Sequence, residues 1–252
     1  MKMKRISSLS TLAFLGIVML AACSTPDGQP QTNSEPLAPS QVSDFGTLYA
    51  QNCGGCHGAE GRGGASVALA NPVYLAIIDE ATMRNIVANG VHGTSMPAFV
   101  QGAGGMLTEQ QIEVITTGIL SRWGRKQVLA GANPPSYAAK VAGNADRGQL
   151  VFGTYCASCH GSEGAGTPKG SAITNDSFLA LVSNQGLRTM VITGRPELGA
   201  PDWRGNVPGR SMTDQEITDV VAWLVSRRAE NPGQPYSALH DTQQSKAQHP
   251  EK

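Results

Sequence analysis

The chain has little charge and few aromatic side chains: charged residues make up 15% of its 252 residues and aromatic residues 5%. Its 19 basic and 19 acidic residues balance, and no basic stripe is present, so no nucleic-acid partner is expected. Thirty glycines and fifteen prolines predict much loop and little side-chain bulk. A core built from such a chain has room for something other than side chains, and a buried prosthetic group is one candidate.

No period-2 alternation typical of strands appears, and the apolar run Leu9–Leu20 is too short to span a bilayer well. This run follows a positively charged start and leads into Leu20-Ala21-Ala22-Cys23, which resembles a bacterial lipobox. The resemblance implies a lipoprotein signal peptide at 1–23 with lipid attached to Cys23; an ordinary signal peptide with an incidental cysteine is the alternative. We expect a protein of the bacterial cell envelope, on the periplasmic side and lipid-anchored to a membrane.

An internal repeat divides the rest of the chain into two halves. Cys53-Gly54-Gly55-Cys56-His57 in the first half matches Cys156-Ala157-Ser158-Cys159-His160 in the second, at an offset of 103 residues. Two stretches with apolar residues at helical spacing, Met83–Gly90 and Leu187–Gly194, also match, and each ends in a glycine suited to a helix C-terminus. The repeat therefore predicts two domains of similar structure.

Two capping boxes predict where the last helix of each half begins. Their residues are Thr108 with Gln111 and Thr213 with Glu216. The apolar residue before each box, Leu107 or Met212, can pack on the first turn of the helix as a hydrophobic staple. We expect these helices at about 109–122 and 214–228.

These patterns together predict an all-α fold of two tandem domains joined by a linker. We expect a signal peptide at 1–23, a flexible tether at 24–42, a first domain at 43–124, a linker at 125–143, a second domain at 144–230 and a disordered tail at 231–252.

The two Cys-x-x-Cys-His motifs predict two covalently bound haem c groups. The spacing puts both sulfurs of a pair on one helical turn, from which they reach the two vinyl carbons of a haem, and the adjacent imidazole reaches the iron. A disulfide framework, a zinc knuckle and a thioredoxin-type pair fit less well. Each pair is followed at once by histidine, no fourth zinc ligand lies nearby, and a βαβ context is absent.

At these motifs the chain resembles the class I cytochrome c family, as two copies in tandem over about 44–124 and 145–229. The resemblance implies a small all-α fold around each haem, one-electron transfer by the iron, and His57 and His160 as the proximal iron ligands. It assigns the thioether bonds to Cys53, Cys56, Cys156 and Cys159.

In this family the second axial ligand is usually a methionine in the loop before the last helix. Met96, in Gly93-Thr94-Ser95-Met96-Pro97, fits that place in the first half. Met106 is the alternative, but it lies beside the cap of the next helix. In the second half, counting from Gly194 puts Ala200 where Met96 would be, and alanine cannot bind iron.

Several candidates for the sixth ligand of the second haem therefore stay open. They are Met212, Met190, His240, Lys169 and an open or water-bound iron. Met212 also fits the staple position, Met190 fits a buried helical face, His240 lies in the tail, and Lys169 lies on the other side of the haem motif.

Two functions fit these features. The first is an electron carrier without enzymatic activity, acting in a membrane-associated respiratory chain as a subunit or docking partner of a larger redox complex. The second is a haem enzyme or sensor that binds a small molecule at an open second iron, for which Glu197 is the nearest acid–base candidate. The tether, the two haems and the lack of other motifs favour the carrier.

Overall fold

The computed structural model describes residues 37–229. The predicted signal peptide with Cys23, most of the predicted tether, and the predicted tail with His240 lie outside the described residues. The chain divides into two compact units at Pro39–Ser40, and both Cys-x-x-Cys-His motifs lie in the second unit.

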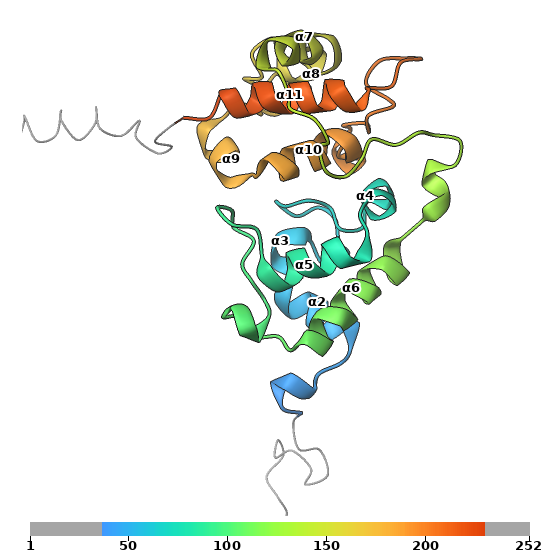
Figure 1. Ribbon diagram of the computed structural model, residues 1–252, viewed down its shortest axis with the longest axis vertical. Helices are drawn as coiled ribbons and strands as arrows, with labels where there is room; N and C mark the ends of the chain where they lie inside the picture. The colour runs from blue at the N-terminus through green and yellow to red at the C-terminus, as the bar shows by residue number, and fades with distance from the viewer. Residues whose placement is uncertain (1–36, 230–252) are drawn as a thin grey trace, which may run out of the picture. The chain divides into compact units, whose positions relative to one another are not determined.

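The described residues form an all-helical structure in which the two halves repeat the same order of helices (Figure 1). The first half contains α2 (Phe45–Asn52), α3 (Gly54–His57), α4 (Pro72–Ile77), α5 (Glu80–Asn89) and α6 (Glu109–Trp123). The second contains α7 (Ala145–Tyr155), α8 (Ala157–His160), α9 (Asp176–Leu181), α10 (Asn184–Thr193) and α11 (Asp214–Ser226). Between 37 and 229 there is no β-strand, only isolated bridges, which confirms the predicted fold class.

Both predicted capping boxes are present. The Thr108 side chain accepts from the Gln111 amide while the Gln111 side chain accepts from the Thr108 amide, and Thr213 and Glu216 do the same. These reciprocal bonds satisfy amide groups that have no partner inside the helix, and they fix the first residue of α6 and of α11.

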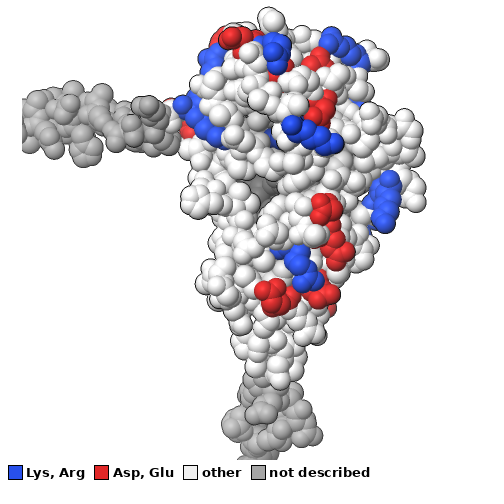
Figure 2. Space-filling model, in the orientation of Figure 1, with Lys and Arg blue, Asp and Glu red and all other residues white. Residues whose placement is uncertain are grey.

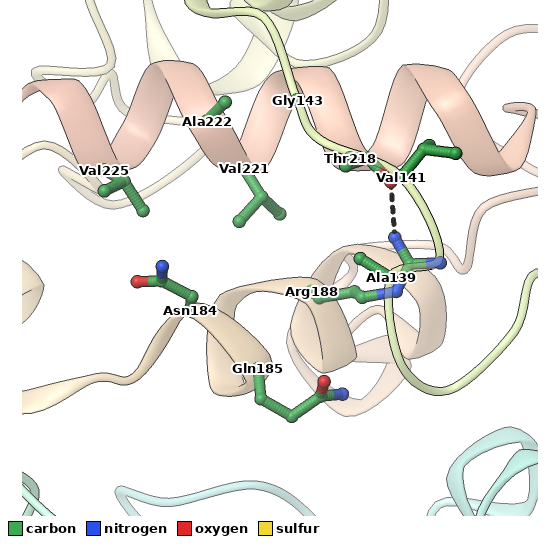
Figure 3. A pocket seen from close by; sticks show the side chains of 10 residues that line it. All are labelled: Ala139, Val141, Gly143, Asn184, Gln185, Arg188, Thr218, Val221, Ala222 and Val225. Atoms are coloured by element: carbon green, nitrogen blue, oxygen red, sulfur yellow. Dashed lines mark hydrogen bonds between the residues drawn. The ribbon is translucent and has the colours of Figure 1, made fainter.

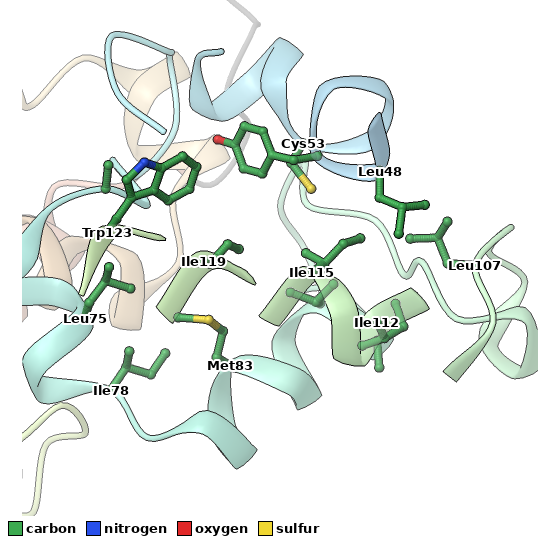
Figure 4. Close-up of a cluster of buried hydrophobic side chains, with 14 of the residues drawn as sticks. Leu48, Cys53, Leu75, Ile78, Met83, Leu107, Ile112, Ile115, Ile119 and Trp123 are labelled. Carbon is green, nitrogen blue, oxygen red and sulfur yellow. The ribbon is translucent and has the colours of Figure 1, made fainter. Parts of the chain in front are cut away.

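Each half has its own hydrophobic cluster. In the first, Leu48, Met83 and Cys53 belong to one cluster with Ile112, Ile115 and Ile119 of α6 (Figure 4). The second is built from large side chains of four helices, and its members include Phe152, Leu179, Ile192 and Trp223. The Phe152 and Trp223 rings lie 4.3 Å apart between centroids. The staple residues Leu107 and Met212 are buried in their respective clusters, as the sequence predicted.

The short helices α4 and α9 were not predicted, because six residues show no periodicity. Both arise from an asparagine N-cap. Asn71 accepts from the amides of Val73 and Tyr74, and Asn175 accepts from the second and third residues after it in the same way. Such bonds supply partners for the first amides of a helix, so a short helix forms where glycine-rich loop was expected.

The linker is held firmly against the second half. The buried Arg188 on α10 donates to the backbone carbonyls of Ser136 and Tyr137 at 2.9 and 3.1 Å, and it pairs with Asp214 at 2.5 Å. It also donates to Thr218 of α11 at 2.9 Å, across a groove bounded by the linker, α10 and α11 (Figure 3).

Residues 37–229 contain no helix that is both long and apolar enough to cross a bilayer.

Helices α7 and α11 cross closely at Gly148. A Cβ at this position would collide with the carbonyl oxygen of Asp219 on α11. The Asp219 carboxylate receives bonds from Arg147 and from the amide of Asn144, which hold the start of α7 on α11. These hydrogen bonds together outweigh the effect of burial and lower the pKa of Asp219. Glycine at 148 is therefore required by the approach of the two backbones.

We predict that Gly148→Ala destabilises the second domain by about 1–3 kcal/mol, because the new methyl group forces the helices apart. Gly153→Ala, in the same helix, is the control: its Cβ would meet nothing within 4 Å. This control should stabilise by up to about 1 kcal/mol through helix propensity. Urea unfolding followed by circular dichroism measures both, and equal stability of the two variants would contradict the close crossing.

Candidate functional site

Each Cys-x-x-Cys-His motif forms one helical turn directly after a longer helix. In the first half, the amides of Cys56 and His57 donate to the Cys53 carbonyl at 3.2 and 3.0 Å. The second half repeats this geometry at Cys156, with the same two distances. The turn therefore brings the two thiols of a pair and the imidazole close together, as the sequence predicted. None of the four cysteines in the described residues is paired in a disulfide.

Both histidines are oriented by a backbone carbonyl. The Nδ1 atom of His57 lies 2.8 Å from the Val67 oxygen, and that of His160 lies 2.7 Å from the Ser171 oxygen. A carbonyl only accepts, so Nδ1 carries the proton and the lone pair is on Nε2. Metal-binding histidines are commonly held in this way, and the residues present therefore fit a haem iron at Nε2.

Burial sets the charge state of these groups. It raises the pKa of the Cys53 thiol to about 11 and that of the Cys156 thiol to about 12, which reflects how deeply both side chains lie beside the hydrophobic clusters. Burial also lowers the pKa of His57, against the opposing effect of the bond to Val67. A neutral imidazole is the form that binds metals, so this shift is in the direction that a ligand needs.

The loops after α5 and α10 share one closing backbone hydrogen bond, although only the second contains a short 3-10 helix, at Pro196–Leu198. The Val91 amide donates to the Met96 carbonyl at 3.0 Å, and the Arg195 amide donates to the Ala200 carbonyl at 2.9 Å. The glycine before each loop has a positive φ, 69° at Gly90 and 61° at the matching glycine of the second half. Ala200 is therefore the structural counterpart of Met96, not only its counterpart in the sequence repeat.

The remaining methionines lie in different surroundings. Met106 is 79% exposed, whereas Met212 is 3% exposed and belongs to the second hydrophobic cluster. The Met212 amide donates to the Trp203 carbonyl at 2.9 Å, as the Leu107 amide donates to the Phe99 carbonyl at 2.8 Å. Met212 thus holds the place of Leu107 at the helix cap.

The other candidates are Met190 and Lys169. Met190 lies within α10 and is partly buried. Lys169 is exposed, in a loop whose Thr167 hydroxyl donates to the Cys159 carbonyl at 2.5 Å. Its loop therefore packs on the attachment motif itself.

Sequence reasoning missed three features of the sites. The carbonyls of Val67 and Ser171 leave no signal in sequence, because any residue supplies a carbonyl. The third feature is the ion pair of Glu197, an exposed loop residue whose side chain is 24% exposed and accepts from Arg195 at 2.5 Å. The sequence signal for this ion pair is the opposite charge of two residues that lie two positions apart.

Two family models match this chain in separate regions. The model for cytochrome c matches residues 145–228, and the model for cytochrome c oxidase, cbb3-type, subunit III matches residues 40–117.

The relatives found by sequence are longer proteins. The cbb3-type cytochrome c oxidase subunit CcoP of Azospirillum sp. (strain B510) is 31% identical over 131 residues, which are 48% of this chain and 39% of that protein. The subunit CcoP of Azospirillum brasilense is 28% identical over 162 residues, 60% of this chain and 49% of that protein. The matched part thus spans about half or less of each relative.

Among solved structures, a chain of the Kuenenia stuttgartiensis reducing HAO-like protein complex is similar at 18% identity and a TM-score of 0.43, covering 77% of this chain and 100% of that one. A likeness at this score supports no conclusion about function.

The matched regions contain the two attachment motifs and the two anchored histidines, one set in each half. Two cytochrome c domains imply two covalently attached haem c groups. The chain is therefore a dihaem cytochrome c with its two domains in tandem.

Proposed function

We propose that this cytochrome is an electron carrier that passes single electrons in a membrane-associated respiratory chain. The observation that carries the proposal is the duplicated one-turn motif with each histidine held by a carbonyl, at 2.8 and 2.7 Å. A histidine held in one orientation suits a haem iron that gains and loses one electron without any change of ligand. The proposed attachment and proximal residues are Cys53, Cys56, His57, Cys156, Cys159 and His160.

The chain contributes to this function by holding ligands and excluding water. Haem, when bound, supplies a one-electron iron couple. The buried clusters around Leu48 and Phe152 provide apolar walls of low dielectric constant, and Met96 is the proposed sixth ligand in the first domain. A thioether ligand favours the ferrous state and raises the potential.

The proposed partners are subunits of a larger redox complex. The relatives in Azospirillum are named as subunits of a cbb3-type oxidase, and this supports a similar setting for the present chain. Charged side chains are sparse on the face in Figure 2, so most of that face is open to apolar or neutral contacts. The proposed domain boundaries, 43–124 and 144–230, place one haem in each.

We predict that the holoprotein carries two haem masses and that both irons titrate reversibly as one-electron couples. Absorbance during anaerobic potentiometry measures this directly. Peroxide consumption should stay at the level of free haem c peptide, since no acid–base side chain is proposed to act on substrate. Catalytic turnover of peroxide would contradict the carrier and favour the enzyme.

The proposed location is the periplasmic side of the cell envelope, with a lipid anchor at Cys23. Its support is the lipobox-like sequence that ends at this cysteine. Several acyl chains hold a protein firmly on a membrane, whereas one holds it only marginally.

Cys23→Ser should release the protein from membranes or block its maturation. Fractionation of cells with haem staining measures this, and Cys23→Ala should behave in the same way because it also lacks the thiol. Wild-type protein found wholly in the soluble periplasmic fraction would contradict the anchor.

A second candidate function rests on Ala200. The position equivalent to Met96 has no ligand atom, so the second iron is open to a small molecule unless another side chain binds it. The ion pair of Arg195 with Glu197 lies in the same loop. A haem enzyme or sensor would use such a site.

We predict that carbon monoxide binds about one haem in two in the reduced wild type. Ala200→Met should abolish most of that binding, because it restores a thioether at the matching place. Met96→Ala is the reciprocal variant and should allow both haems to bind. Optical titration in the Soret band measures the uptake. Wild-type protein that takes up no carbon monoxide would contradict the open site, and Met212→Ala would then test that sulfur.

A further inference from the structure

The two domains meet through a buried asparagine. The Asn71 amide donates to the carbonyl of Thr193, at the end of α10, at 3.2 Å. Asn71 is only 6% exposed, and its oxygen at the same time caps α4. One side chain thus begins a helix of the first domain and binds the backbone of the second. Val73, two residues later, packs in the hydrophobic cluster of the second domain.

Arg195 makes a second bond between the domains. Its guanidinium donates to the Gly64 carbonyl at 3.2 Å and pairs with Glu197 at 2.5 Å. Gly64 lies tightly on the first attachment motif, because a Cβ there would collide with the carbonyl oxygen of Cys56. Arg195 therefore reaches the loop that wraps the first haem motif.

The repeat separates the local role of these two positions from their contact with the other domain. Asn175, the counterpart of Asn71, caps α9 with the same two bonds but is exposed. Val91, the counterpart of Arg195, closes its loop with the same backbone bond. The side-chain amide of Asn71 and the guanidinium nitrogen of Arg195 that reaches Gly64 are thus directed at the other domain, while the same guanidinium also pairs with Glu197 in its own loop.

The two bonds join particular parts of the two sites. Gly64 and Asn71 lie on either side of Val67, whose carbonyl orients His57. Thr193 and Arg195 lie at the start of the loop that ends at Ala200. The two bonds therefore connect the loop that orients His57 in the first domain with the loop that ends at Ala200 in the second.

We propose that Asn71 and Arg195 are positioning residues that hold the two haem sites in register for electron exchange within the chain. In this step one electron leaves a ferrous iron, which becomes ferric, and reduces the ferric iron of the other domain; no bond forms or breaks. The inference rests on the proposed carrier function and adds which two side chains hold the sites in position.

The test uses the full-length holoprotein with Asn71→Ser and Arg195→Val, singly and together. Serine keeps a cap acceptor for α4, and valine is the residue that the first domain has at this place. Asn175→Ser is the matched control for the cap. Arg227→Gln removes a guanidinium that pairs with Glu163 within the second domain. Pulse reduction of one haem, followed optically, measures the exchange rate, and calorimetry measures whether the domains unfold together.

We expect exchange to slow by about tenfold in the double variant, because the two sites are then no longer held in a fixed relative position. We also expect one unfolding transition in the wild type and two in the double variant, while both controls behave as wild type. Exchange that remains at the wild-type rate in a folded double variant would overturn the proposal, even if stability falls. Failure of wild-type haems to cycle reversibly would instead refute the carrier function itself.

Discussion

Each site depends on one constraint: two thiols and one imidazole must lie on a single helical turn, and the imidazole must not rotate. The carbonyl of Cys53 or Cys156 closes the turn by accepting two amides. The carbonyl of Val67 or Ser171 stops rotation of the ring and fixes its tautomer. The glycine-rich segments after each motif serve this purpose, because they let the backbone fold back closely enough to present that oxygen.

The sequence predicted those parts of the fold that depend on neighbouring residues. Thr108 with Gln111 and Thr213 with Glu216 form local boxes, so the last helices begin where expected. The helical turn of each Cys-x-x-Cys-His motif likewise depends only on neighbouring residues. The helices that Asn71 and Asn175 cap were not predicted, because six residues are too few to show the periodicity of a helix.

The parts that could not be predicted are contacts between distant segments. Asn71 and Asn175 have the same residue type and the same cap, yet one is buried against the other domain and the other is exposed. Nothing in the local sequence separates them. The two halves share one order of helices, and they differ at matching positions such as Met96 against Ala200 and Val91 against Arg195.

Arg188 has a consequence for how the chain can be divided. Its guanidinium is buried and takes carbonyl partners from Ser136 and Tyr137, well before α7 begins. A fragment that starts at residue 144 would leave those donors without acceptors, and each unsatisfied buried group costs about 1–3 kcal/mol. The segment around Ser136 and Tyr137 therefore contributes to the stability of the fold around α10 and α11, although it precedes the proposed boundary at residue 144.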